Sequence, residues 1–194
     1  MKGKVYLVGA GPGDPKLVTV KALEVLQQAD VVIYDRLISP QLLMYARADA
    51  LKLYVGKQKD RHTLKQEEIN RNLVKYAQQG KTVVRLKGGD PAVFGRVGEE
   101  AAELVKHHIP YELVPGVSSI YAVPAYAGIP ITHRDHASSF YVVTGHEKPE
   151  KLVSSLKWQH IAHAADTLIF LMGVSRLATI REQLLLHGRS PSTP

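Results

Sequence analysis

The strongest constraint on the fold is the alternation of short apolar runs with helical patterns along the sequence. Strand-length runs rich in apolar residues occur at 4–8, 31–34, 51–55, 82–86 and 111–114. Patterns typical of helices separate most of these runs, at 20–29, 66–79 and 98–108. Because alternating strands and helices are typical of βαβ units, we expect an α/β fold with a largely parallel sheet.

The chain of 194 residues is long enough for one large or two small domains, and Pro115-Gly116 marks the predicted boundary. Beyond it, the patterns predict a helix at 118–127, strands at 139–144 and 167–172, and a helix at 175–187. We therefore expect an N-terminal α/β domain at 1–115 and a C-terminal α/β domain at 116–194. The second domain is short and holds few strands, so we expect it to be incomplete.

Two glycine-rich turns follow predicted strands and are the candidate ligand-binding elements. After the strand at 82–86, Gly88-Gly89 leads into Asp90-Pro91. Glycine has no Cβ, so a ligand can lie directly against such a backbone, and Asp90 offers a carboxylate in a turn that Pro91 stiffens. A plain turn between a strand and a helix uses the same residues, so this turn alone leaves that alternative open.

The other turn, at 9–14, occupies the place of a dinucleotide-binding fingerprint, with Asp35 near the position of a ribose-binding acid. Two details oppose that interpretation. Asp14 replaces the third glycine and would repel a phosphate, and Pro12 lacks the N–H that should point at pyrophosphate. The pattern better suits a ligand without phosphate, such as an adenosyl group that carries a cation. A nicotinamide or flavin enzyme is the alternative.

The charge of the chain favours an anionic partner. The formal net charge is +7, yet there is no lysine/arginine block typical of nucleic-acid-binding tails, and aromatic residues are few. We therefore expect a polyanionic small substrate and no nucleic acid. With no cysteine, no signal peptide and no apolar run of membrane-spanning length, we expect a cytoplasmic protein without disulfides or membrane association. The close histidine pairs lack an obvious third ligand, so we expect no metal site.

Several longer motifs occur together in one order. They are Val8-Gly-Ala-Gly-Pro-Gly-Asp14, Tyr34-Asp-Arg-Leu-Ile-Ser39, Val55-Gly-Lys57, Val84-Arg-Leu-Lys-Gly-Gly-Asp-Pro91, Phe94-Gly-Arg96, Val114-Pro-Gly-Val-Ser118, Tyr126-Ala-Gly-Ile-Pro-Ile-Thr-His-Arg134 and Thr144-Gly-His146. These motifs resemble those of the uroporphyrinogen-III C-methyltransferases, which belong to the tetrapyrrole methylases that use S-adenosylmethionine. The sequence departs from the family pattern at Val97, Ser118-Ser119 and Leu171, where the family tends to have Gly, Thr-Ala and Tyr.

The resemblance implies two methyl transfers from S-adenosylmethionine to uroporphyrinogen III, giving precorrin-2 and S-adenosylhomocysteine, in siroheme or cobalamin biosynthesis. It places a proton acceptor at Asp35 and a proton donor at Lys57, both directly after predicted strands. Unaided by the family, Asp35 would be interpreted as a turn or salt-bridge residue and Lys57 as a solvated surface lysine.

The resemblance also assigns binding residues. Cofactor contacts are expected at Pro12, Gly88, Gly89, Asp90, Val93, Ser118, Ser119 and Met172. Serine at 119 adds a hydroxyl to the family pattern, and Met172 would otherwise be interpreted as core packing. The substrate is a ring edged with carboxylates, which suits arginine forks and lysines. Besides Lys57, Lys59 and Arg61, the candidates are Arg36, Arg85, Lys87, Arg96 and Arg134, although a solvated basic surface would have the same composition.

The resemblance further implies a homodimer with a cleft between two α/β lobes. Two alternatives to the function stay open. One is a methylase of a later corrin precursor, against which Asp35-Arg36 and Val55-Gly-Lys57 argue. The other is an inactive ligand-binding fragment, which only the short second domain favours.

Overall fold

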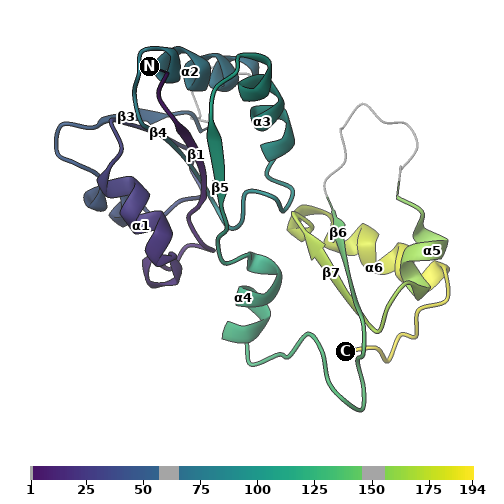
Figure 1. Cartoon of the computed structure of the whole chain (residues 1–194). Helices are drawn as coiled ribbons and strands as arrows, with labels where there is room; N and C mark the ends of the chain where they lie inside the picture. The colour runs from purple at the N-terminus through teal and green to yellow at the C-terminus, as the bar shows by residue number, and fades with distance from the viewer. Residues whose placement is uncertain (1, 57–65, 146–155) are drawn as a thin grey trace. The chain divides into compact units, whose positions relative to one another are not determined.

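The computed structural model describes residues 2–56, 66–145 and 156–194 (Figure 1). The chain divides into two compact units, Met1–Ala122 and Val123–Pro194. This division lies inside helix α4 (Ser119–Tyr126), later in the chain than the boundary predicted at Pro115-Gly116, and the sequence-based domain assignment stays a prediction. Within the described ranges, no helix is long and apolar enough to cross a membrane.

The first unit is built on a five-stranded parallel sheet in the order β3-β2-β4-β1-β5 (Figure 1). The strands are β1 (Val5–Gly9), β2 (Val31–Tyr34), β3 (Leu51–Tyr54), β4 (Val83–Lys87) and β5 (Tyr111–Val114). Every apolar run predicted as a strand in this region forms one. The α/β fold with a parallel sheet is therefore confirmed.

Helices cover both faces of this sheet. Helix α1 (Val20–Gln27) and the 3-10 helix η2 (Pro40–Tyr45) pack on one face, and α2 (Gln66–Gln78) and α3 (Val97–Lys106) pack on the other. Successive side chains of a strand point to opposite faces, so a strand covered on both sides is apolar at nearly every position. The two core clusters, one on each face, are the result.

The strand order creates a switch point between β1 and β4. After β1 the chain crosses past β4 to β2, whereas after β4 it crosses past β1 to β5. In open parallel sheets, ligands bind in the crevice at the carboxyl ends of strands where such connections diverge. The two glycine-rich turns follow β1 and β4, so they lie at this position.

The second unit has a smaller core. Among its described residues, β6 (Phe140–Thr144) and β7 (Thr167–Leu171) form a parallel pair, with α5 (Trp158–His163), the 3-10 helix η3 (Val174–Arg176) and α6 (Leu177–Leu186) beside it. The core includes Val143, Trp158, Ile161 and Ile180. Helix α5 was not predicted, because its six residues are too short for a clear period.

Candidate functional site

The two glycine-rich turns are joined to each other by backbone hydrogen bonds. The N–H of Gly89 donates to the carbonyl of Gly11 at 2.7 Å, and the N–H of Gly11 donates back to the carbonyl of Gly89 at 3.2 Å. Gly116, just after β5, packs so closely that a Cβ there would lie 2.4 Å from the Gly89 carbonyl oxygen. The ends of three neighbouring strands therefore form one rim of bare backbone.

Open space on this rim lies at Gly89. Its φ of +68° is a left-handed conformation, and a Cβ built there would meet no atom within 4 Å. Asp90 fixes the turn, because its Oδ2 accepts from the N–H of Gly116 at 2.9 Å and its Oδ1 accepts from the N–H of Ala92 at 2.8 Å. This rim can receive a ligand against its backbone, which is the fit that an adenosyl amino acid needs.

The turn after β1 does not have the geometry of a dinucleotide fingerprint. In that motif the glycine turn opens directly onto a helix whose N-terminus faces the pyrophosphate. Here Asp14 caps the 3-10 helix η1 (Pro15–Leu17), with its carboxylate accepting from the N–H of Lys16 at 2.8 Å. Helix α1 begins only at Val20, capped by Thr19. The inserted 3-10 turn separates the glycines from the helix N-terminus.

Asp35 follows β2 at the same edge of the sheet. Its Oδ1 accepts from the N–H of Leu37 at 3.0 Å, and its Oδ2 accepts from Nη2 of Arg85 at 3.3 Å. The side chain is 25% exposed, so one side of the carboxylate stays open to a ligand. A proton acceptor must lie within reach of its substrate, and this partial exposure meets that requirement.

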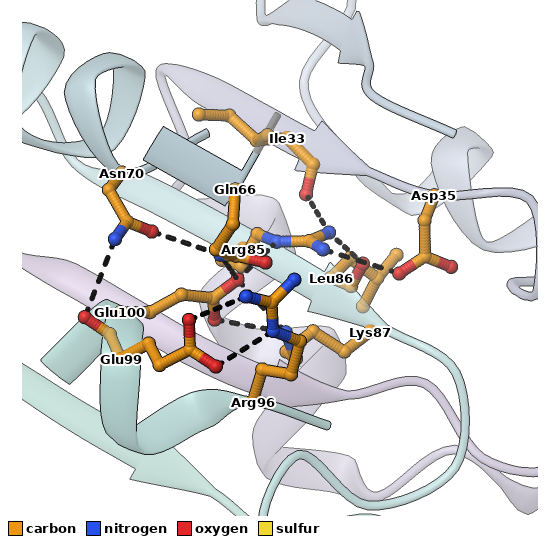
Figure 2. A network of polar contacts seen from close by, with 10 residues as sticks. All are labelled: Ile33, Asp35, Gln66, Asn70, Arg85, Leu86, Lys87, Arg96, Glu99 and Glu100. Atoms are coloured by element: carbon orange, nitrogen blue, oxygen red, sulfur yellow. Dashed lines mark hydrogen bonds and ion pairs between the residues drawn. The ribbon is translucent and has the colours of Figure 1, made fainter. Parts of the chain in front are cut away.

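Arg85 and Lys87 lie inside the unit, between the sheet and helices α2 and α3 (Figure 2). Both side chains share the face of Val83 because residues two apart in a strand point the same way. Fully buried Glu100 of α3 accepts from Arg85 Nε at 3.1 Å and from Lys87 Nζ at 2.9 and 3.0 Å. Gln66 of α2 donates to the same carboxylate at 3.3 Å. Together with Asp35, the network holds two cations and two anions.

Burial is the main influence on the ionisation of Lys87. Loss of solvation lowers the pKa of its ammonium, and the nearby Arg85 guanidinium lowers it further, whereas Glu100 raises it. Glu100 is therefore the counter-charge that opposes the effect of burial on this lysine.

Sequence reasoning did not single out Glu100. A signal was present: Glu100 lies one turn before the buried Leu104 on α3, so it shares the core-facing side of that helix. Two charged residues on the inner face of a covered strand require such a partner.

The structure brings together some of the predicted site residues and leaves others apart. Pro12, Gly88, Gly89, Asp90, Val93, Ser118 and Ser119 all belong to the first unit. Ser118 is buried and accepts from the N–H of Ile120. Arg36 is exposed, and exposed Arg96 pairs with Glu99 at 2.6 and 2.7 Å. Substrate contact by Arg85 and Lys87 stays a prediction, to which their burial gives no support.

Five further residues are not placed with this group. Met172, 54% exposed, and the exposed Arg134 belong to the second unit. Lys57, predicted as the proton donor, lies outside the described residues, as do Lys59 and Arg61. Their roles remain predictions.

Comparison with known proteins finds close relatives of this chain. The chain is 56% identical over 192 residues to the uroporphyrinogen-III C-methyltransferase of Priestia megaterium, covering 99% of this chain and 80% of that protein. It is 55% identical to a protein of the same name from Bacillus subtilis (strain 168), of which it spans 40%.

Solved structures of methyltransferases share the fold of this chain. The uroporphyrin-III C-methyl transferase of Thermus thermophilus, crystallised with S-adenyl homocysteine, matches with a TM-score of 0.80 and 44% identity, over 97% of this chain and 74% of that one. A cobalt precorrin-4 methyltransferase matches with a TM-score of 0.83 but only 32% identity, over 96% and 76% of the two chains. The family model for tetrapyrrole (corrin/porphyrin) methylases matches residues 4–194. These matches confirm the resemblance seen in the sequence motifs, and the chain belongs to the tetrapyrrole (corrin/porphyrin) methylases.

Proposed function

We propose that this chain transfers methyl groups from S-adenosylmethionine to two pyrrole carbons of uroporphyrinogen III, giving precorrin-2 for siroheme or cobalamin biosynthesis. The observation that carries the proposal is the rim of bare backbone at the switch point, with Asp35 at the end of the neighbouring strand. A rim of glycine backbone receives a cofactor closely, and Asp35 supplies a carboxylate oxygen beside it.

The residues divide the work as follows. S-adenosylmethionine, when bound, supplies an electrophilic methyl group on a sulfonium. Gly88, Gly89 and Asp90 hold its amino-acid part. The Asp35 carboxylate takes up the proton left on the methylated carbon framework. The proton-donor role expected for Lys57 belongs to the same proposal. Cofactor contact by Met172 and contact of exposed arginines such as Arg36 with substrate carboxylates belong to the same proposal.

Two other functions are less well supported. A nicotinamide or flavin enzyme needs phosphate-binding amides at a helix N-terminus, and the 3-10 turn at Pro15–Leu17 displaces that helix. A methylase of a later corrin precursor has the same architecture. Among the solved structures, identity of 44% to a uroporphyrin-III enzyme, against 32% to a precorrin-4 enzyme, favours the earlier substrate.

Two measurements test this function. Calorimetry should detect binding of S-adenosylhomocysteine and none of NAD. Incubation with uroporphyrinogen III and methyl-labelled S-adenosylmethionine should place two labels on the tetrapyrrole. NAD binding without adenosylhomocysteine binding would overturn the cofactor. In a parallel incubation with a later corrin precursor, label on that precursor and none on uroporphyrinogen III would overturn the substrate.

The proposal also includes a homodimer in the cytoplasm. Both features come from the sequence and its resemblance. Sedimentation over a wide concentration range tests the dimer, and fractionation of the source cells tests the location. A monomer at every concentration would contradict the first expectation.

A further inference from the structure

The guanidinium of Arg85 is fixed by partners on three elements besides Asp35. Its Nε donates to Glu100 on α3, and its Nη1 donates to two backbone carbonyls, of Leu86 at 3.1 Å and of Ile33 at 3.4 Å. Figure 2 shows the guanidinium between these anchors, with Nη2 directed at Asp35. The orientation of Arg85 is therefore set by β2, β4 and α3, independently of the Asp35 carboxylate.

Glu100 is itself held firmly. Lys87 binds both of its oxygens, and Gln66 donates to the oxygen that Arg85 shares. No part of the Glu100 side chain is exposed, and that of Arg85 is 4% exposed. In such a dry setting, charged hydrogen bonds hold their geometry more tightly than they do in water.

Asp35 is the more exposed of the two carboxylates that contact Arg85. It lies past the end of β2, it is 25% exposed, and its other carboxylate oxygen accepts from the Leu37 N–H. A short carboxylate in that position can rotate about its side-chain bonds. The contact with Arg85 removes this freedom at one oxygen and leaves the exposed side for a substrate.

We propose that the buried Arg85–Glu100 ion pair is a positioning device that orients the Asp35 carboxylate for proton uptake. Arg85 and Glu100 act as positioning residues, and neither touches the reacting atoms. Only an arginine can do this here, because its planar fork serves Glu100, two carbonyls and Asp35 at once, whereas a lysine offers a single nitrogen. The inference rests on the proposed proton-acceptor role of Asp35.

A double-mutant cycle on the full chain tests the inference. Single-turnover methyl transfer to uroporphyrinogen III is measured at saturating substrate and cofactor for the unmodified protein, Arg85→Lys, Asp35→Asn and the double variant. We expect Arg85→Lys to slow transfer roughly ten- to a hundredfold, because small misplacements of a reacting group cost about that much. In the Asp35→Asn background, the same change should cost less than about twofold, since its effect passes through Asp35.

A matched control uses Arg47, which lies between η2 and β3, away from Asp35 and Arg85 in the sequence. Arg47 pairs with Asp30, which precedes β2, at 3.3 Å, and with Asp49 at 2.5 Å. Arg47→Lys should leave the single-turnover rate unchanged. Thermal midpoints of all variants separate loss of fold from loss of rate. If Arg85→Lys does not fold, Glu100→Asp, which keeps the charge and shortens the anchor, replaces it in the cycle.

Each other outcome identifies what fails. Equal slowing by Arg85→Lys in both backgrounds would overturn positioning through Asp35. A raised KM with an unchanged single-turnover rate would assign Arg85 to direct substrate binding instead. If Asp35→Asn slows single-turnover methyl transfer and Arg85→Lys does not, the inference is overturned and the proposed function is still supported. An unchanged rate in Asp35→Asn would overturn the proton-acceptor role and the inference with it.

Discussion

Replacing Glu100 by glutamine should strongly destabilise the first unit. The change keeps the size of the side chain and one acceptor oxygen but removes the negative charge. Arg85 and Lys87 would then share Asp35 as their one remaining anion in the network. The new amide NH₂ would also face the Lys87 ammonium, two donors that cannot bond each other.

The structure sets the expected loss in the free energy of unfolding. Glu100 is 0% exposed and lies within 3.1 Å of both cations, so the variant leaves buried charge uncompensated. Breaking a buried ion pair by removing one partner costs about 3–5 kcal/mol. Domains have about 5–15 kcal/mol of stability in total, so the variant should still fold in the absence of denaturant.

The loss should depend on pH, through Lys87. Burial lowers the pKa of the Lys87 ammonium in the folded chain below the ordinary 10.5. Between that lowered pKa and 10.5, the unfolded chain binds more protons than the folded chain, so stability rises with pH. Without the Glu100 charge, the folded-state pKa falls further and this range extends downward. The destabilisation by Glu100→Gln should therefore be smaller at about pH 9 than at about pH 7.

Urea unfolding followed by circular dichroism at both pH values measures the loss, with hydrogen exchange of the β4 amides reporting the first unit. Trp158, the one tryptophan, reports the second unit by fluorescence. The matched control is Glu100→Gln combined with Lys87→Met. This double variant leaves Arg85 paired with Asp35 and removes the unpaired lysine. It should therefore recover at least about half of the stability lost in Glu100→Gln, and the loss should no longer depend on pH.

A different result would refute this reasoning. A loss below about 1 kcal/mol, typical of exposed ion pairs, would mean that the network is solvated. A double variant less stable than Glu100→Gln would mean that Lys87 contributes packing or bonding that its charge does not explain.

Three further predictions concern the site and the surface. Asp35→Asn should bind S-adenosylhomocysteine normally in calorimetry yet methylate at least about a hundredfold more slowly in single turnover; an unchanged rate would contradict the acceptor role. Gly89→Ala puts a methyl group into the open rim at positive φ and should weaken adenosylhomocysteine binding, whereas Gly98→Ala, also in open space, should not; equal affinities would remove the rim from the cofactor site. Hydrogen bonds from Lys21 and Lys4 lower the pKa of Glu112 from 4.5 to about 2. The contribution of Glu112 to stability is therefore present above pH 4.5 and lost as the pH falls toward 2. Glu112→Gln should flatten acid unfolding over that window at low salt, and an unaltered acid transition would show that the pair contributes nothing.

The sequence by itself determined the elements and their class. Periods of two and of about 3.6 residues are local properties, so the strands, the main helices and the parallel sheet follow from patterns within short windows. The glycine turns at the ends of β1 and β4 were likewise visible, because glycine and proline act on their own backbone. The motifs that carry the family resemblance lie in these same turns and strand ends.

Only the tertiary structure decided where the charges of β4 point. Arg85 and Lys87 matched a basic patch for an anionic substrate, since lysine and arginine are usually exposed. They are buried because α2 and α3 cover their face of the sheet and because Glu100 of α3 pairs with both of them. The contacts between Gly11 and Gly89, and between Asp90 and Gly116, likewise join segments distant in sequence. Such pairings arise from strand order and packing, which a local pattern cannot encode.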